Sequence, residues 1–203
     1  DYYLGSGGKA NTRQGDGVLS AAAPASDTPD RFIYDPRDPV ISSDEGPYDQ
    51  AAKELRPDIL VYSTPPLEAD LEVTGPVRAV IFAESSAPNT DFTVKLVDVY
   101  PDGRAMSLCD GIIRASFREP GKKPSNIEPG KVYEYNVDLW ATSNVFLKGH
   151  RIRVEVSSSN FPRFDRNLNT GEDVATGTRI AKAEQSVHHG KRYPSRIVLP
   201  VIP

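Results

Sequence analysis

Three consecutive serines, Ser157–Ser159, are followed closely by Asn160, Arg163, Asp165 and Arg166. A serine hydroxyl becomes an effective nucleophile only when a neighbouring base accepts its proton, whereas arginine and aspartate side chains readily form charge-assisted hydrogen bonds. No base stands at a recognisable spacing from these serines. Two interpretations therefore compete: a reactive cluster, or a structured corner at the end of a strand.

The flanking residues favour the corner. The alternation that precedes the serines places Ser158 on the inward face of a strand, and Pro162 cannot donate to a sheet ladder, so strand pairing should stop near it. We expect Phe161 and Phe164 to anchor the corner in the core. The charged residues expected to hold the loop, or to reach a neighbouring domain, are Arg163, Asp165 and Arg166.

Histidine is scarce, with three residues in the chain. His150 follows a turn at the start of a strand, and we interpret it as a hydrogen-bonded loop histidine rather than a catalytic base. His188 and His189 would point to opposite faces of an extended strand. A zinc site needs three or four converging ligands, so no metal is expected from this pattern.

Other chemical patterns are weaker. The carboxylate pairs Glu68 with Asp70 and Asp44 with Glu45 are interpreted as surface acids rather than a catalytic pair. The acidic loop at 169–173 could offer oxygen ligands to calcium, but it lacks the regular spacing of a calcium loop. No G-x-S-x-G nucleophile elbow occurs. We expect neither a cofactor nor a catalytic residue in this chain.

Trp140 and Cys109 are two further candidate site residues. Trp140 could bind a sugar as an exposed aromatic, although packing at the rim of the core is the commoner arrangement for such a residue. Cys109 is the one cysteine, which excludes an internal disulfide, and it is expected to be a small buried hydrophobic residue.

These residues are carried by segments whose apolar residues alternate with period two, the pattern of strands with one face on a core and the other in water. Val77, Ala79, Ile81 and Ala83 share one face, for example, and Asp-Gly within 101–103 predicts a hairpin turn. In the segment 150–158, Arg151, Arg153 and Glu155 are expected on the face in water. The strand-like segments are 58–63, 76–86, 91–100, 131–140, 150–158 and 195–201. Strands at this spacing predict an all-β sandwich or jelly roll.

Three segments depart from the alternation. Residues 47–55 could form a turn or two of helix, and 5–30 and 160–193 are expected to be long polar loops. Loops of this length in a compact domain are usually functional, interfacial or loosely ordered.

Composition limits the function classes. The chain has 203 residues and a net charge of −4, without the basic excess of a nucleic-acid-binding protein. No apolar run approaches the length of a membrane span. The chain starts at Asp1 with a strand-like stretch, which suggests an excised or processed piece of a longer protein. The compartment stays open, with the cytoplasm favoured.

The order of motifs resembles a known family. The stretches are FIYDPRDPV (32–40), GPYDQ (46–50), LRPDILVYSTPPLEADLEVTGPV (55–77), NTDF (89–92), LVDVYPDGRAMSLCDGIIRASFR (96–118), GHRIRVEVSSSNFPRFDRNLNTG (149–171) and PSRIVLPVIP (194–203). Together they resemble the C-terminal domain of X-Pro dipeptidyl-peptidases and cocaine esterase-like serine hydrolases, a group that includes α-amino-acid ester hydrolases. The resemblance covers nearly the whole chain, and the stretch at 149–167 is its most specific part.

The resemblance implies a jelly-roll, galactose-binding-like β-sandwich that follows an α/β-hydrolase catalytic domain in the same polypeptide. It implies that the catalytic triad lies in that preceding domain, and that the sandwich packs on it, shapes the substrate cleft and can take part in homo-oligomers. The parent would be a dipeptidyl-peptidase or an ester or acyl hydrolase.

We therefore expect residues 1–203 to form one C-terminal domain, with 1–30 as an incoming strand and long polar loop and 31–203 as the main sandwich. Packing on a second domain would leave an exposed apolar patch on this one. The residues expected at that contact, or holding its structure, are Asn160, Phe161, Arg163, Phe164, Asp165, Arg166, Tyr2 and Tyr3. The alternatives are a carbohydrate- or ligand-binding module, and an enzyme with a nucleophile among Ser157–Ser159.

Overall fold

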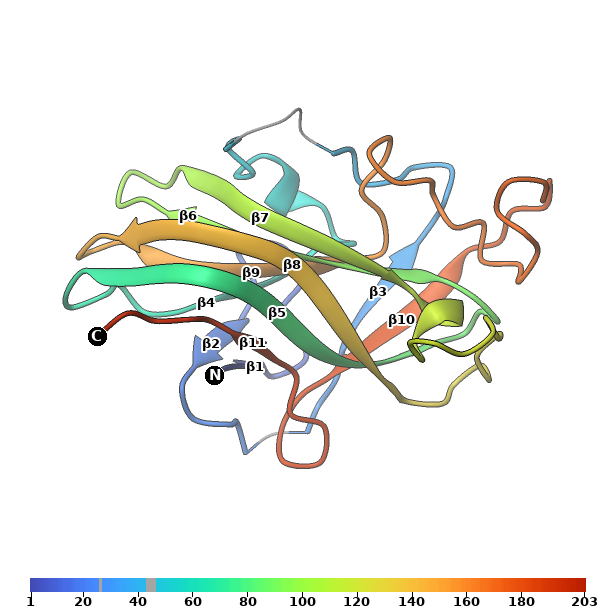
Figure 1. The fold of residues 1–203 in the computed structure, drawn as a ribbon, viewed down its shortest axis with the longest axis horizontal. Coiled ribbons are helices and arrows are strands. Elements are labelled where there is room, and N and C mark those ends of the chain that lie inside the picture. Colours follow the sequence, from blue (N-terminus) through green and yellow to red (C-terminus); the bar gives the residue numbers. More distant parts are fainter. Residues whose placement is uncertain (26, 43–46) are drawn as a thin grey trace.

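The computed structural model describes residues 1–25, 27–42 and 47–203 (Figure 1). Within these residues the chain is almost entirely β-structure, with two short 3-10 helices, η1 (Lys53–Leu55) and η2 (Ala115–Phe117). The strands are β1 (Tyr2–Gly5), β2 (Val18–Ser20), β3 (Asp30–Tyr34), β4 (Leu60–Ser63), β5 (Leu71–Ser85), β6 (Asp91–Val99), β7 (Ala105–Arg114), β8 (Tyr133–Phe146), β9 (Arg151–Ser157), β10 (Ala183–His188) and β11 (Arg196–Val198).

The strands form one continuous hydrogen-bonded sheet in the order β3-β10-β5-β11-β1-β2-β4-β9-β6-β7, and β8 pairs with β5 outside this path. The sheet folds over itself, so that the inner faces of β5 and β8 pack against those of β4, β6 and β9 around one main core. The largest fully buried side chains of that core include Tyr62, Phe92, Tyr135 and Phe146. The all-β sandwich expected from the sequence is confirmed.

The alternation correctly predicted which residues of β5 and β8 face the core. On β5, Val77, Ala79, Ile81 and Ala83 are all buried in the main core. On β8, the residues between the buried ones are exposed. The turn after β6 also has the expected form, since Gly103 adopts φ +91° and its N–H bonds the Tyr100 carbonyl.

The prediction was wrong for the outer face of β9. Arg153 and Glu155 were expected in water, but both are buried. Residues 47–58 lie over this face, and Glu54 of η1 pairs with Arg153 across it. The helix expected at 47–55 is reduced to the single 3-10 turn of η1.

The two long loops are more ordered than their composition suggested. Residues 5–30 contain β2 and the buried side chains of Ala10 and Leu19. Residues 160–193 contain β10, which pairs with both β3 and β5. No helix in the described part of the chain has the length and apolarity to cross a membrane.

Candidate functional site

The serine run is buried and structural. Ser157 Oγ lies 2.6 Å from Thr93 Oγ1 on β6, and Ser159 Oγ accepts a 2.8 Å hydrogen bond from the Val40 backbone N–H. Ser158 Oγ accepts a 3.2 Å hydrogen bond from Gln185 Nε2 on β10. In the described residues none of these hydroxyl contacts involves a histidine. The run therefore joins three separate segments and lacks an activating base.

His150 is the hydrogen-bonded residue that the sequence predicted. Its Nδ1 lies 2.9 Å from Asp98 Oδ1, and its ring packs 4.3 Å from the Tyr100 ring, centroid to centroid. Burial raises the pKa of the Asp98 carboxyl, and the hydrogen bond with His150 opposes that shift. Both side chains are buried, so this pair connects β6 to the turn before β9 and does not face a substrate.

One serine–histidine–aspartate meeting does exist, and sequence reasoning missed it. His189 Nε2 lies 3.0 Å from Ser6 Oγ and 3.2 Å from Asp30 Oδ2. A catalytic triad needs the serine and the carboxylate on different ring nitrogens, but here both meet Nε2. The Ser6 hydroxyl is also 2.7 and 2.8 Å from the two Asp30 oxygens, so it can donate its proton there directly.

The Asp30 carboxylate is instead a structural acceptor. It also receives the Tyr62 hydroxyl and the Ala10 backbone N–H, each at 2.8 Å. Burial raises the pKa of Asp30, but these hydrogen bonds together outweigh burial and lower it. The cluster holds residues 6–10 against the sheet. Its members lie up to 183 positions apart in the chain, and no local pattern announces such a contact.

The corner after β9 is held by β7 and by residues 40–42. Asn160 Nδ2 donates to Asp110 Oδ2 at 2.6 Å, and Arg163 forms an ion pair with the same carboxylate. Phe161 exchanges backbone hydrogen bonds with Val40 and Ser42.

The aromatic residues of the corner are placed differently from expectation. Phe161 and Phe164 are half-buried and lie outside the core. Instead, each ring lies near an arginine. The Arg166 guanidinium lies 5.7 Å from the Phe161 ring centroid. The Arg163 guanidinium lies 5.3 Å from the Phe164 ring centroid. Arg166 also donates to the Pro36 carbonyl at 2.9 Å.

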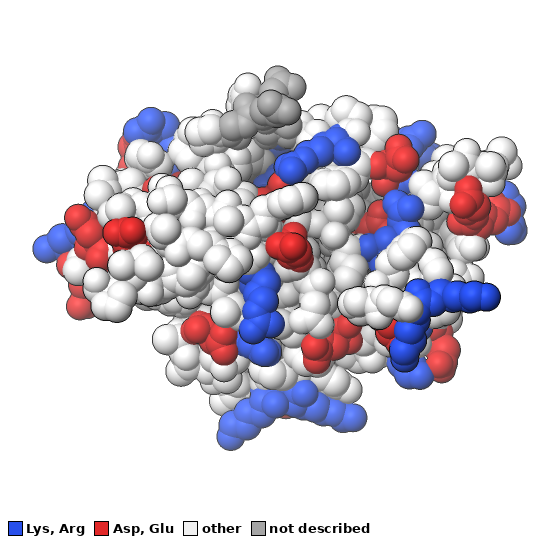
Figure 2. All heavy atoms as spheres, in the orientation of Figure 1, with Lys and Arg blue, Asp and Glu red and all other residues white. Residues whose placement is uncertain are grey.

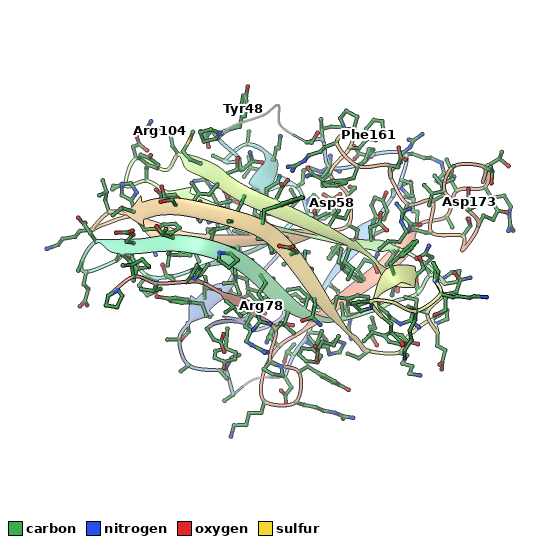
Figure 3. All side chains as sticks on the ribbon, viewed as in Figure 1. Tyr48, Asp58, Arg78, Arg104, Phe161 and Asp173 are labelled. Carbon is green, nitrogen blue, oxygen red and sulfur yellow. The ribbon has the colours of Figure 1, made fainter. Side chains whose placement is uncertain are left out.

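Exposed and half-buried apolar residues lie at this corner and at the outer edge of β7, where residues 48–50 pair with residues 105–107. Ile41 is 50% exposed and pairs with Phe161, and Tyr48 is 42% exposed and exchanges hydrogen bonds with Ser107 of β7. Figure 3 shows Tyr48 and Phe161 along the same upper side of the molecule. We define the β7-edge surface as Ile41, Tyr48, Phe161, Pro162 and Phe164.

Tyr2 and Tyr3 do not join this surface. They pair with Ile197 and Arg196 of β11, and β1 lies on the lower side in Figure 1. The structure thus brings Asn160, Phe161, Arg163 and Phe164 together but leaves the two tyrosines elsewhere. Asp165 contacts Arg114 through its backbone carbonyl at 3.4 Å.

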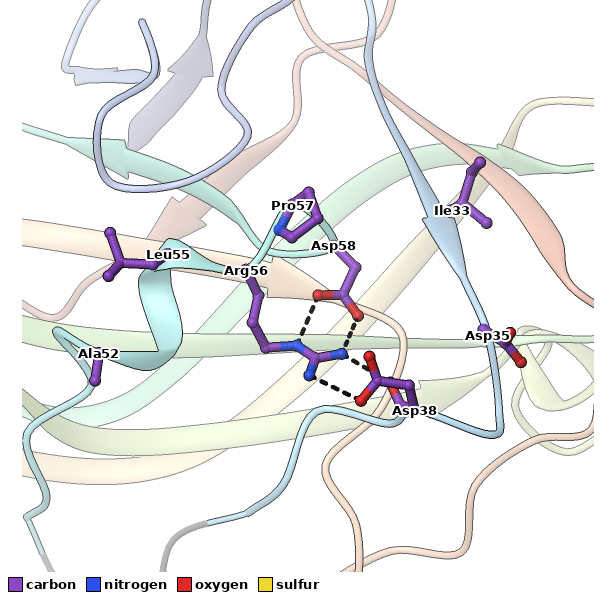
Figure 4. Close-up of a pocket in the computed structure, with 8 residues that line it drawn as sticks. All are labelled: Ile33, Asp35, Asp38, Ala52, Leu55, Arg56, Pro57 and Asp58. Carbon is purple, nitrogen blue, oxygen red and sulfur yellow. Dashed lines mark hydrogen bonds and ion pairs between the residues drawn. The ribbon is translucent and has the colours of Figure 1, made fainter.

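A pocket of about 420 Å³ lies beside β3 (Figure 4). Arg56 crosses it and is held by Asp58, at 2.8 Å to each oxygen, and by Asp38. The hydrogen bonds that Arg56 donates to Asp58 raise the pKa of Arg56. The pocket is lined by Ile33, Asp35, Asp38, Ala52, Leu55, Arg56, Pro57 and Asp58. None of these is a serine, cysteine or histidine, so the described lining offers no hydroxyl, thiol or imidazole nucleophile.

Trp140 is 71% exposed, so the expectation that it packs at the core rim was wrong. Its φ of +66° is unusual for a residue other than glycine. The β5–β8 register shifts between Pro76 and Arg78, opposite this part of β8, and Asp138 Oδ1 accepts the Trp140 N–H at 2.8 Å. The bulge turns the indole outward.

Two of the remaining candidate acids have partners within the chain. Glu172 pairs with Arg179 at 2.6 Å, and Asp70 accepts the Lys148 N–H at 2.7 Å. Asp44 and Glu45 lie outside the described residues. Among residues 1–25, 27–42 and 47–203, no three histidine, cysteine, aspartate or glutamate side chains are placed to hold a metal ion. On the face shown in Figure 2, basic and acidic side chains are interspersed.

Comparison with known sequences covers nearly the full chain. The sequence profile of the X-Pro dipeptidyl-peptidase C-terminal non-catalytic domain matches residues 1–198. A cocaine esterase of Rhodococcus sp. (strain MB1 Bresler) is 50% identical over 99% of this chain and 37% of its own length. A putative serine esterase of Mycobacterium bovis is 29% identical over 71% of this chain.

Solved structures also resemble this chain over nearly its full length. An aminopeptidase from a marine sediment Thaumarchaeota archaeon superposes on 100% of the chain with a TM-score of 0.89 and 32% identity. An α-amino acid ester hydrolase superposes on 99% with a TM-score of 0.89 and 28% identity. The chain spans 36% of each of these proteins, so most of each relative has no counterpart here.

Proposed function

Since the chain belongs to the family of X-Pro dipeptidyl-peptidase C-terminal non-catalytic domains, we propose that it packs on an α/β-hydrolase domain of the same polypeptide and walls part of its substrate cleft. The observation that carries this proposal is the family match over residues 1–198, combined with a chain that spans 37% of the cocaine esterase. Residues 1–203 would then form one C-terminal domain. The parent would be a serine hydrolase acting on esters, acyl compounds or X-Pro peptides.

The β7-edge surface is the contact that we favour. It gathers exposed and half-buried apolar side chains beside the outer edge of β7, and a domain interface of ordinary size needs such apolar residues at its centre. Asp110 fixes the backbone of this surface through Asn160 and Arg163, so the patch would be presented in a defined shape. The occupant would be the hydrolase part of the same chain.

The test uses the full parent enzyme with Ile41→Asp, and Val145→Asp as a matched control, because these residues are 50% and 44% exposed. Hydrogen exchange at residues 40–42, 47–48 and 160–166, together with kcat/KM on an aryl ester, would be measured. We expect Ile41→Asp to increase exchange and lower kcat/KM by tenfold or more, with little change for the control. Equal behaviour of the two variants would contradict the proposed contact.

A second candidate function rests on Trp140. An exposed indole held outward by a bulge, beside the polar residues Asn136 and Asp138 of β8, has the composition of a sugar-stacking surface. A glycan array on the wild-type chain and on Trp140→Ala would decide. Binding that disappears in the variant supports this candidate, and absence of wild-type binding removes it.

A further inference from the structure

Four charged side chains are buried together beneath η1. Glu54 comes from η1, Arg153 and Glu155 from β9, and Lys95 from β6, and each of these residues is at most 9% exposed. Gln50, also buried, accepts a 3.1 Å hydrogen bond from Lys95 Nζ. Burying charges is costly unless each finds a partner, so the way they share partners determines their charge states.

The two carboxylates differ in the number and the distance of their cationic partners. Glu54 Oε2 lies 2.5 Å from Arg153 Nη1 and 3.8 Å from Arg13 Nε. In the part of the chain that the structure describes, the ion-pair partner of Glu155 Oε2 is Lys95 Nζ at 3.8 Å, and Lys95 already donates to Gln50. The negative charge of Glu54 is therefore better stabilised than that of Glu155, so Glu155 is the carboxyl group that more readily holds a proton.

The remaining oxygens point to where a proton would lie. Glu54 Oε1 and Glu155 Oε1 are both buried without a hydrogen-bond partner among the described residues. Two facing carboxylates repel one another, whereas a carboxylic acid donates to a carboxylate. A single proton would satisfy both oxygens at once.

We propose that Glu155 retains a proton and donates it to Glu54, and that this proton-dependent contact fastens residues 48–58 to the outer face of β9. Backbone hydrogen bonds of Glu54 connect this contact to neighbouring segments. Glu54 receives the N–H of Arg13 on its carbonyl at 2.8 Å and donates its own N–H to the Gln50 carbonyl at 2.9 Å. The attached segment carries Tyr48 and the pocket residues Ala52, Leu55, Arg56, Pro57 and Asp58.

The electrostatic surroundings agree in direction. Burial raises the pKa of the Glu155 carboxyl from 4.5 to about 7; Lys95 and Arg153 oppose the rise, while Glu54 adds to it. The charged groups that face Glu155 are thus Lys95 on β6, Glu54 on η1 and Arg153 on β9 itself. The inference stands on this chain alone and does not depend on the proposed docking to a hydrolase.

Proton linkage fixes the sign of the effect. Below pH 4.5 the folded and unfolded states both hold the proton on Glu155. Between pH 4.5 and about 7 only the folded state keeps it, so stability from this group falls as pH rises, and it is constant above that window. The folding equilibrium constant would decrease by up to about 300-fold through this group.

The test compares denaturant unfolding of the 203-residue chain from pH 5 to pH 9 with that of Glu155→Gln, with Glu54→Gln as control. We expect Glu155→Gln to lose the decline across the window and to match or exceed the wild type in stability at pH 8. Glu54→Gln should be less stable throughout, because it weakens the pairing of Arg153. Parallel wild-type and Glu155→Gln profiles, or a Glu155→Gln variant less stable than the wild type at pH 8, would overturn the proposal.

A second measurement does not depend on a variant that folds. Carbon-detected NMR of the wild-type chain, with the Glu155 carboxyl assigned, follows its titration directly. The proposal is supported by a titration midpoint well above pH 4.5 together with weaker amide-exchange protection of residues 48–58 above that midpoint. The exchange rates are first corrected for the pH dependence of the intrinsic rate. A midpoint near pH 4.5, or exchange protection that does not change across the titration, contradicts it.

Discussion

Arg114, the last residue of β7, donates two hydrogen bonds to Asp91, the first residue of β6, at 2.9 and 3.1 Å. Asn167 donates a third to the same carboxylate at 2.8 Å. This arrangement closes the open end of the β6–β7 pair and fastens the loop after β9 to it. It does for the loop what Asp165 and Arg166 were expected to do.

Arg114→Ala should therefore be strongly destabilising. It leaves a buried carboxylate without its cation, for which a loss of about 3 kcal/mol or more is typical. Asp165→Ala should cost less than about 0.5 kcal/mol, because Asp165 contacts Arg114 through its backbone carbonyl. Urea midpoints of the two variants test this ranking. Equal midpoints would show that Asp91 does not hold the loop.

Gly111→Ala should disrupt the meeting of β7 and β8. A Cβ at Gly111 would lie 2.0 Å from the Asp138 carbonyl oxygen, which is backbone and cannot turn away. We expect a loss of about 3 kcal/mol or more, or a chain that does not fold. Gly121→Ala is the control, because a Cβ there meets nothing within 4 Å and only its φ of +76° is penalised, by about 1–2 kcal/mol. Thermal melts of both chains would show the difference.

Ser158→Ala should leave the hydrolytic activity of the parent enzyme unchanged. Gln185 Nε2 keeps its 2.7 Å hydrogen bond to Thr90 Oγ1, so the variant should lose only about 1 kcal/mol of stability. An acylation burst with a chromogenic ester provides the measurement. Disappearance of the burst in a folded variant would restore the serine run as a catalytic candidate.

Cys109 is only partly buried against the main core, less than the sequence predicted, and it should still react slowly with alkylating reagents in the folded chain. Burial, with Asp110 adding to it, raises the pKa of the Cys109 thiol to about 12, and the thiolate is the reactive form. Its alkylation at pH 8 should speed up by at least about a hundredfold in denaturant. Because the chain has one cysteine, mass spectrometry reads this site without interference. Similar native and denatured rates would contradict the assigned burial.

Sequence reasoning succeeded where one strand face alone decides the pattern. On β8, the buried Tyr135, Val137 and Leu139 alternate with exposed residues, and the period-two signal is then local. It failed on Arg153 and Glu155, since the segment that covers them is far away in the chain and has no periodicity of its own. Burial of charge is a tertiary property that a local pattern does not encode.

The candidate site divides in the same way. Asn160, Phe161 and Arg163 could be singled out, because residue types that end a strand cluster locally. The strand β10 was missed, since Gln185 and Ser186 read as polar loop residues. Gln185 is buried because Thr90 and Ser158 supply its hydrogen-bond partners, and both lie far from it in sequence. The same distance hid the contact of Ser6 with His189.

The position of β1 has a consequence for synthesis of the chain. β1 lies between β2 and β11 inside the sheet, so one of its edges stays unpaired until residues 196–198 have been made. Pairing between the two ends of a chain is slow to form, because the long intervening loop must first be closed. A nascent or C-terminally truncated chain would therefore expose a strand edge in the middle of its sheet, where another chain could add. Synthesis of residues 196–198 is therefore the step that seals this sandwich.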